Sequence, residues 1–169
     1  MKQGFVKVAS ATPRIRVADP VYNAQVICEQ AKEAAEHGAK IVVFPELCIT
    51  GYTCNDLFLQ ELLLEKAKEA LLTIAEETGQ LETLFLVGLP VDKDGRLYNV
   101  AAVLYRGRIL GMIPKKNIPM YAEFYEGRHF TPGEETVTEY RLGKQVIPFG
   151  SNLLFRCEEL PELVLGCEL

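Results

Sequence analysis

The sequence IVVFPEL, at residues 41–47, carries a clear strand signal. Its first four residues are apolar and mostly β-branched, which predicts a short strand covered on both faces. Pro45 ends this strand, because proline cannot donate a ladder hydrogen bond. A helix is predicted just before it, with Asp19 as N-cap, Pro20 as its first residue and Gly38 as its stop.

The same alternation of strand and helix extends in both directions. Residues 6–10 are predicted as a first strand. Residues 59–78 carry apolar side chains at helical spacing, which predicts a second helix. Residues 84–87 are predicted as another short strand that Gly88-Leu89-Pro90 ends. Alternating strands and helices of this kind indicate an α/β layered domain.

The second half of the chain contains hairpins instead of helices. Asp94-Gly95 marks a turn, and residues 98–105 and 108–113 are predicted as two strands joined tightly at Arg106-Gly107. Residues 114–150 are rich in loops, with one strand near their end at residues 146–149. Further strands are predicted at residues 153–155 and 163–167. These strands predict a mixed sheet in a single domain of 169 residues. Because the last predicted strand reaches the final residues, we expect the fold to be C-terminally truncated.

Composition excludes several classes of function. With 18 basic and 23 acidic residues and a net charge of −5, the chain has no basic stripe for nucleic acid. No apolar run is long enough to cross a membrane, and no secretory signal opens the chain, so a cytoplasmic location is expected. The five cysteines are scattered and form no CxxC pair, and the two histidines lie far apart. Neither a disulfide framework nor a metal site is therefore expected.

Three groups of residues could carry chemistry. Glu46 follows a buried strand, where ligand crevices of α/β sheets lie, and its carboxylate could act as a general base or merely cap a loop. Lys115 follows another strand, and its ammonium could stabilise an oxyanion, or with Lys116 form a solvated pair. Residues 121–126 crowd aromatic and acidic side chains into a loop that either binds a ligand or docks its rings on the core.

Four motifs, taken together in their order along the chain, indicate a protein family more specifically than any one of them does alone. PELCITGY (residues 45–52), PKKNIP (114–119), YAEFYEGRHF (121–130) and GCEL (166–169) resemble the carbon–nitrogen hydrolase, or nitrilase, superfamily. Within it they resemble the N-terminal glutaminase domain of the glutamine-dependent NAD synthetases. The resemblance implies a nitrilase-like four-layer αββα sandwich with mixed sheets. Residues 1–169 would then be the N-terminal part of such a domain, with the synthetase domain absent.

The resemblance also assigns roles to individual residues. It implies that Glu46 is the general base, that Lys115 is the catalytic lysine, that Tyr121 contacts the substrate and that Tyr52 lies near the pocket. The nucleophilic cysteine of this family follows a Gly-x-Glu-[Ile/Leu] sequence, so we expect it directly after Leu169.

Cys167 is not the expected nucleophile. It comes three residues too early, and this odd offset turns its side chain to the opposite face of a strand. Cys48 and Cys54, in the loop that carries the glutamate, are interpreted as packing residues.

The function implied by the resemblance is hydrolysis of L-glutamine. In the full-length enzyme the ammonia would serve the ATP- and Mg-dependent conversion of deamido-NAD to NAD, whereas this chain would bind no cofactor and would be inactive alone. A homo-oligomer is expected, because a truncated sheet exposes an edge and part of its core. Two alternatives stay open: a fragment of a free-standing nitrilase-type amidase, and a fragment that folds or assembles without turning anything over.

Overall fold

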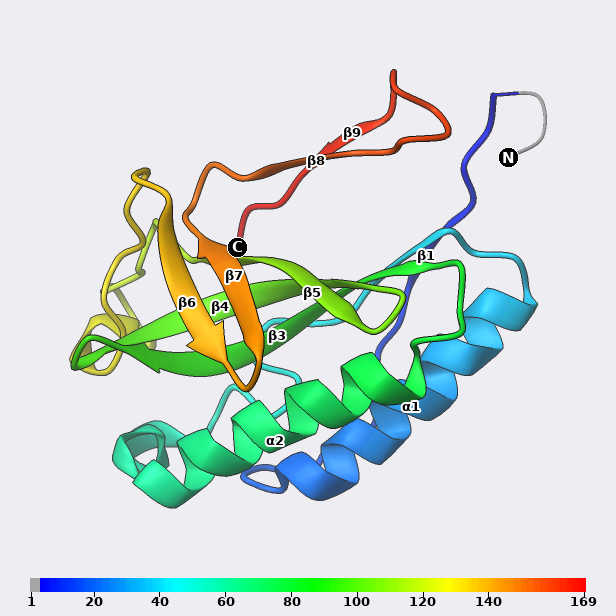
Figure 1. Cartoon of the computed structure of the whole chain (residues 1–169). Coiled ribbons are helices and arrows are strands. Elements are labelled where there is room, and N and C mark those ends of the chain that lie inside the picture. The colour runs from blue at the N-terminus through cyan, green and yellow to red at the C-terminus, as the bar shows by residue number, and fades with distance from the viewer. Residues whose placement is uncertain (1–3) are drawn as a thin grey trace.

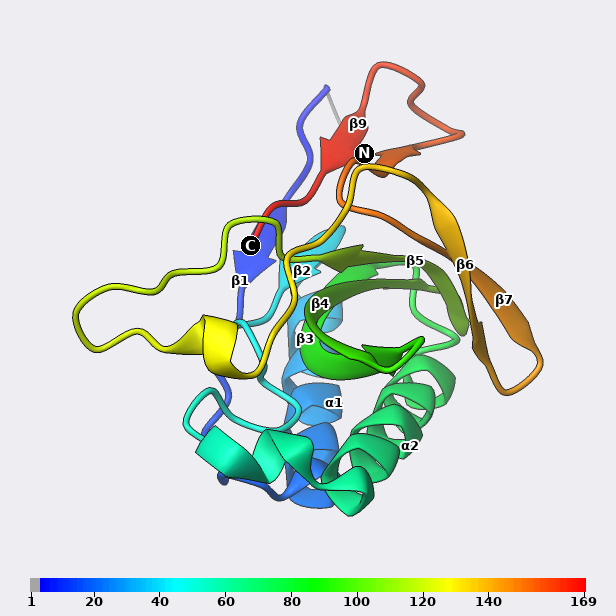
Figure 2. The same cartoon turned by 90° about the vertical axis from the view of Figure 1, so that its left-hand side faces the viewer.

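The computed structural model describes residues 4–169, which form a mixed sheet with helices on one face and a two-stranded ribbon on the other (Figures 1 and 2). The seven strands that these residues give the sheet are β1 (Val8–Ser10), β2 (Ile41–Val43), β3 (Leu84–Lys93), β4 (Arg96–Tyr105), β5 (Arg108–Pro114), β6 (Thr138–Leu142) and β7 (Gln145–Phe149). Their order across the sheet is β1-β2-β3-β4-β5-β7-β6. β1, β2 and β3 are parallel, and β3, β4 and β5 form an antiparallel meander. The predicted mixed α/β sheet is confirmed.

Two helices of 17 residues each cover one face of the sheet within the described range. α1 (Pro20–Glu36) begins as predicted: the Asp19 side chain accepts a hydrogen bond from the Tyr22 N–H at 3.1 Å. α2 (Glu61–Glu77) begins two residues later than predicted, because a 3₁₀ turn, η1 (Asn55–Leu59), comes first. No helix between residues 4 and 169 combines the length and apolar character that a membrane span requires.

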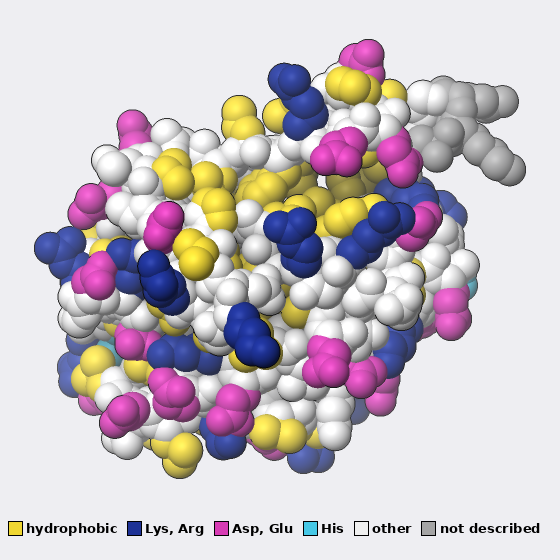
Figure 3. All heavy atoms as spheres, viewed as in Figure 1, with side chains coloured by type: hydrophobic (Ala, Val, Ile, Leu, Met, Phe, Trp, Pro, Cys, Tyr) yellow, Lys and Arg dark blue, Asp and Glu magenta, His cyan; other side chains and the backbone are white. Residues whose placement is uncertain are grey.

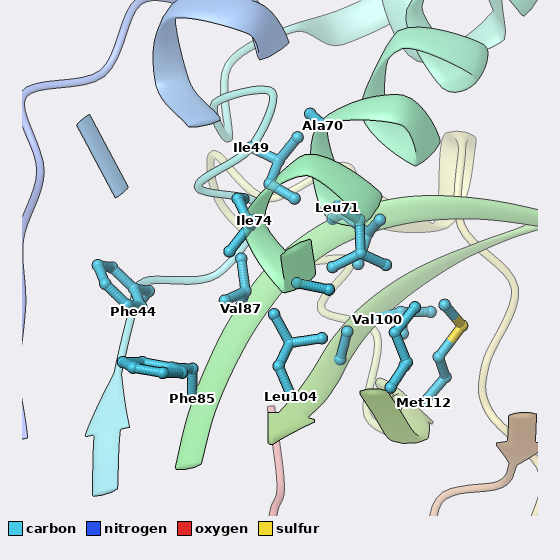
Figure 4. Packing of buried hydrophobic residues seen from close by; sticks show 14 of the residues in the cluster. Phe44, Ile49, Ala70, Leu71, Ile74, Phe85, Val87, Val100, Leu104 and Met112 are labelled. Carbon is cyan, nitrogen blue, oxygen red and sulfur yellow. The ribbon is translucent and has the colours of Figure 1, made fainter. Parts of the chain in front are cut away.

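The main core lies between these helices and the sheet. The predicted apolar stripe of α2 is buried, and Leu71 and Ile74 on it point toward Val87 of β3 and Leu104 of β4 (Figure 4). All four side chains are almost completely removed from water. Burial of one such side chain stabilises the fold by roughly 1.5–3 kcal/mol, so this layer anchors the strands that carry the site.

Two tight turns connect the meander. The Asp94-Gly95 and Arg106-Gly107 pairs all have positive φ, between 46° and 76°, as the two-residue turns of twisted hairpins require. Both turns are confirmed. The register then changes by one residue, since Leu104 pairs with Ile109 but Val103 pairs with Gly111. Leu110 is therefore the extra residue of a β-bulge in β5.

The strand at residues 84–87 does not end at Gly88-Leu89-Pro90, so that prediction is wrong: β3 continues to Lys93. The Gly88 carbonyl accepts a hydrogen bond from the Ile49 N–H at 3.1 Å, on the side of β2. Backbone groups two residues apart in a strand point to the same side, so Pro90 faces that side too, beyond the end of β2. Its missing N–H therefore removes no ladder bond.

A second difference concerns β6. No strand is predicted for residues 138–142, yet they pair with β7 from Thr138↔Phe149 to Leu142↔Gln145. Only Tyr140 and Leu142 of this strand are buried. Two apolar positions in five residues are too weak a pattern to distinguish a strand from the loop around it.

The sheet face opposite the helices is only partly covered. Val43 is 44% exposed, so the prediction that residues 41–44 are covered on both faces is wrong for the described residues. The ribbon of β8 (Leu154–Arg156) and β9 (Val164–Gly166) lies over this face and leaves a cavity of about 570 Å³, whose hollow is visible in Figure 3. The layers follow one another in the order α, β, β, as the predicted αββα sandwich requires as far as residue 169.

Gly88 should not tolerate a side chain. A Cβ atom there would lie 2.4 Å from the Leu47 nitrogen and 2.8 Å from the Pro45 carbonyl oxygen, which are backbone atoms that cannot rotate away. We expect Gly88→Ala to lower the free energy of unfolding by about 1–3 kcal/mol, measured by urea denaturation. Gly166→Ala is the matched control, because its Cβ would meet only Leu154 at an ordinary 3.4 Å. Equal stability of the two variants would contradict this close packing.

Candidate active site

Glu46 and Lys115 lie at the same edge of the sheet. β5 runs in the direction of β2, because two antiparallel steps separate β3 from β5. Glu46, three residues beyond β2, and Lys115, directly after β5, therefore both extend from carboxyl ends of strands, where α/β sheets hold their ligands. The glutamate loop turns sharply at Leu47, whose φ is +52°, and packs directly on Gly88.

The Lys115 ammonium contacts two carboxylates at once. Its Nζ lies 2.8 Å from Oε1 of Glu46 and 2.9 Å from Oε1 of Glu126. The Lys115 side chain is only 9% exposed, compared with 32% for Glu46. Backbone hydrogen bonds fix the lysine on both sides, from its N–H to Asn99 and from the Gly133 N–H to its carbonyl. The structure thus brings the predicted glutamate and lysine into direct contact.

The surroundings of Lys115 keep it charged. Burial by itself lowers the pKa of the ammonium, but the hydrogen bonds to Glu46 and Glu126 outweigh burial and raise the pKa above its usual range. At neutral pH the side chain is therefore a cationic hydrogen-bond donor. Such a group can stabilise a developing negative charge, but it cannot accept a proton.

Glu126 is a site residue to which the sequence assigns no role. It begins the 3₁₀ turn η2 (Glu126–Arg128), and its buried Oε1 also accepts a hydrogen bond from the Tyr52 hydroxyl at 2.7 Å. Burial and this bond raise the pKa of Tyr52, so the phenol stays a neutral donor. The available signal was the acidic character of residues 121–126, but nothing in the motif distinguishes Glu126 from Glu123.

Asn99 is a second site residue that sequence reasoning missed. It is fully buried in the middle of β4, and its side-chain amide donates a hydrogen bond to Oε1 of Glu46. The signal was one polar residue inside the otherwise apolar run of residues 97–105. In a buried strand such a residue needs a polar partner, although the sequence does not identify that partner.

Tyr121 and Lys116 lie apart from this cluster. The Tyr121 side chain is 68% exposed, and its ring packs edge-on against Phe124 with centroids 5.5 Å apart. Lys116 is exposed and pairs with Glu135 at the surface. The structure therefore brings Glu46, Lys115 and Tyr52 together but leaves Tyr121 at the surface.

Three cysteines of the described chain are poorly suited to act as nucleophiles. Burial raises the pKa of Cys48 to about 12 and also raises the pKa of Cys54 and Cys167, which disfavours the thiolate. Cys167 packs against the apolar cluster between sheet and ribbon. The neighbouring Glu168 accepts a hydrogen bond from Asn117, only two residues beyond Lys115, at 3.3 Å. The segment after β9 thus passes close to the lysine loop.

The buried contact between Glu126 and Lys115 should stabilise the fold. We expect Glu126→Gln to lower the pKa of Lys115, measured by NMR titration of its side chain, because burial remains while one carboxylate is lost. The free energy of unfolding should fall by about 1–3 kcal/mol at neutral pH. A lysine with a raised folded-state pKa stabilises the fold at neutral pH, and this contribution is lost only as pH rises through that alkaline value.

Glu135→Gln is the matched control, because Glu135 pairs with the adjacent but exposed Lys116. It should leave the free energy of unfolding unchanged, as surface pairs usually contribute little. Equal effects of the two substitutions on unfolding would contradict a special role for the buried contact.

Comparisons with known proteins identify the family to which the chain belongs. Residues 7–153 match the model of the carbon-nitrogen hydrolase family. The glutamine-dependent NAD(+) synthetase of Mycobacterium tuberculosis (strain ATCC 25618 / H37Rv) is 39% identical over 168 residues, which cover 99% of this chain and 25% of that protein. The enzyme of the same name from Thermotoga maritima is 36% identical over 80% of this chain and 23% of its own length.

The solved structures give the same result. A glutamine-dependent NAD(+) synthetase from Cytophaga hutchinsonii superposes with a TM-score of 0.85 and 28% identity, over 91% of this chain and 26% of that one. An amidase from Nesterenkonia sp., at 24% identity and a TM-score of 0.63, shares the fold. The chain spans about a quarter of the length of the curated relatives it matches. By its sequence match and its fold, the chain belongs to the carbon-nitrogen hydrolase family.

Proposed function

We propose that this chain is the glutaminase part of a glutamine-dependent NAD synthetase. Residues 1–169 then form the N-terminal part of a carbon-nitrogen hydrolase domain that releases ammonia from the side-chain amide of L-glutamine. The names of the relatives support this assignment, since their identity of up to 39% extends along nearly the whole chain. The single observation that carries the catalytic proposal is the 2.8 Å contact between the Lys115 ammonium and the Glu46 carboxylate.

In this proposal each group of the site has a distinct role. Glu46 takes the proton of a cysteine thiol, and the resulting thiolate attacks the glutamine amide carbon. Lys115 stabilises the oxyanion of the tetrahedral intermediate, which its buried ammonium, with a pKa above its usual range, suits it to do. Ammonia leaves and water hydrolyses the thioester. Glu126 and Tyr52 hold Lys115 in place, and the exposed Tyr121 is a candidate contact for bound glutamine.

The proposed nucleophile is a cysteine that directly follows Leu169. The motif Gly166-Cys167-Glu168-Leu169 supports this position through the family resemblance. The contact between Asn117 and Glu168 also supports it, because it holds the residues next to Leu169 close to the Lys115 loop.

The remaining partners belong to the proposal for the larger protein. We assign ATP and Mg to a synthetase domain that uses the ammonia to amidate deamido-NAD, and we assign no residue of this chain to either. A homo-oligomer is part of the same proposal, since apolar side chains such as Val8 and Val43 are exposed along the parallel strands.

Glu46 and Lys115 can be tested by substitution in the polypeptide that the complete gene encodes. We expect Glu46→Gln and Lys115→Met each to lower kcat for glutamine hydrolysis by about 100-fold or more, measured as ammonia release. Lys116→Met should leave kcat unchanged, because Lys116 is exposed and pairs with Glu135 at the surface. Hydrolysis of simple aliphatic amides in preference to glutamine would instead favour a free-standing amidase.

The position of the nucleophile has its own test. We expect residues 1–169, expressed alone, to release no measurable ammonia from glutamine, because the buried thiols of this chain resist ionisation. The complete polypeptide is the positive control. Ammonia release by the 169-residue chain that disappears in Cys167→Ala would overturn the assignment of a nucleophile beyond Leu169.

A further inference from the structure

Asn99 contacts both members of the proposed catalytic pair. Its backbone carbonyl accepts a hydrogen bond from the Lys115 N–H at 2.7 Å, and its side-chain amide donates to Oε1 of Glu46. Asn99 is fully buried in β4, which lies between β3, on which the glutamate loop packs, and β5, which ends directly before the lysine. It therefore fixes the backbone of Lys115 and the side chain of Glu46 from one point of the sheet.

The orientation of the Asn99 amide follows from its partner. A carboxylate only accepts hydrogen bonds, so the amide must turn its NH₂ group, not its oxygen, toward Glu46. Oδ1 of Asn99 is then buried, and no residue in the range 4–169 donates to it. An unpaired buried oxygen destabilises a fold, so an apolar residue would serve β4 better if stability alone mattered.

The contacts of Glu46 differ between its two oxygens. Oε1 accepts hydrogen bonds from both Asn99 and Lys115. Among the described residues, none donates to Oε2, and the side chain is about one-third exposed. A terminal carboxylate torsion is broad, and with one donor its two equivalent oxygens can exchange. Two donors attached to different strands remove that freedom and leave Oε2 for the reaction.

We propose that Asn99 is a positioning residue that, together with Lys115, fixes the Glu46 carboxylate so that Oε2 takes the proton of the nucleophile. This inference rests on the proposed function. In the step itself, the thiol S–H bond breaks, its proton moves to Oε2, and the sulfur keeps the electron pair with which it attacks the amide carbon. Asn99 donates to Oε1 throughout and exchanges no proton.

The test compares variants of the complete gene product in glutamine hydrolysis. Asn99→Leu has nearly the same size but lacks the donor. We expect kcat to fall about tenfold to a hundredfold, since a misplaced base loses part of its general-base contribution, while KM changes less than about twofold. The melting temperature should stay the same or rise, because the unpaired oxygen is removed together with the donor.

Thr83→Val is the matched control. Thr83 is also buried, and its hydroxyl donates to the Ala39 carbonyl at 2.8 Å, away from Glu46 and Lys115. This substitution should lower the melting temperature and leave kcat unchanged. If Asn99→Leu lowered the melting temperature while kcat per folded molecule stayed at the wild-type value, Asn99 would be structural and the inference would be overturned.

Asn99→Asp provides a second readout that does not depend on Asn99→Leu folding. The new carboxyl lies against the carboxylate of Glu46, so it holds its proton to higher pH than an isolated carboxyl, and only its protonated form can donate. We expect kcat of Asn99→Asp to be low near about pH 8 and to recover partly toward about pH 6. Over the same range we expect no such rise in the kcat of the wild type. Absence of that recovery would contradict the inference. A wild-type protein that hydrolyses no glutamine would instead overturn the proposed function itself.

Discussion

An ammonium group that leaves water stays charged only where oxygen atoms replace its hydration shell. For Lys115 these oxygens come from Glu46 and Glu126, which lie 69 residues before it and 11 residues after it in the chain. The sheet must therefore bring the ends of β2 and β5 to one edge, and the loop after β5 must fold back to deliver Glu126. The strand order and the close packing of the glutamate loop on Gly88 both serve this one electrostatic requirement.

Much of the fold could be predicted because its signals are local. Asp19 caps its own helix and Asp94-Gly95 forms its own turn, so a few neighbouring residues suffice to recognise them. Pro90 misled the prediction because a proline ends a strand only where a neighbouring strand needs its N–H. Whether β2 extends as far as Pro90 depends on the assembled sheet and cannot be seen in the local sequence. Glu46 and Lys115 could be found by motif, whereas Glu126 and Asn99 acquire meaning only from the side chains that folding brings against them.

The region around Lys115 departs repeatedly from the most stable geometry. Leu47 has a positive φ, and Oε2 of Glu126 and Oδ1 of Asn99 are buried without a partner among residues 4–169. Each such feature costs on the order of 1–3 kcal/mol. Val100, Ala102 and Leu104 of β4 belong to the apolar layer between the helices and the sheet, whereas Asn99 alternates with them and faces the other side of the strand. Stability and candidate chemistry thus occupy different parts of the same domain.

The bulge at Leu110 has a consequence for how this hairpin can vary in length. From the turn at Arg106-Gly107, β5 needs one residue more than β4 to bring Lys115 opposite Asn99, and Leu110 absorbs that difference. A hairpin without Leu110 would pair regularly and still place the ammonium at the same point. Related proteins can therefore gain or lose this residue in evolution without relocating the lysine, which makes the bulge a natural point of tolerance for insertion and deletion.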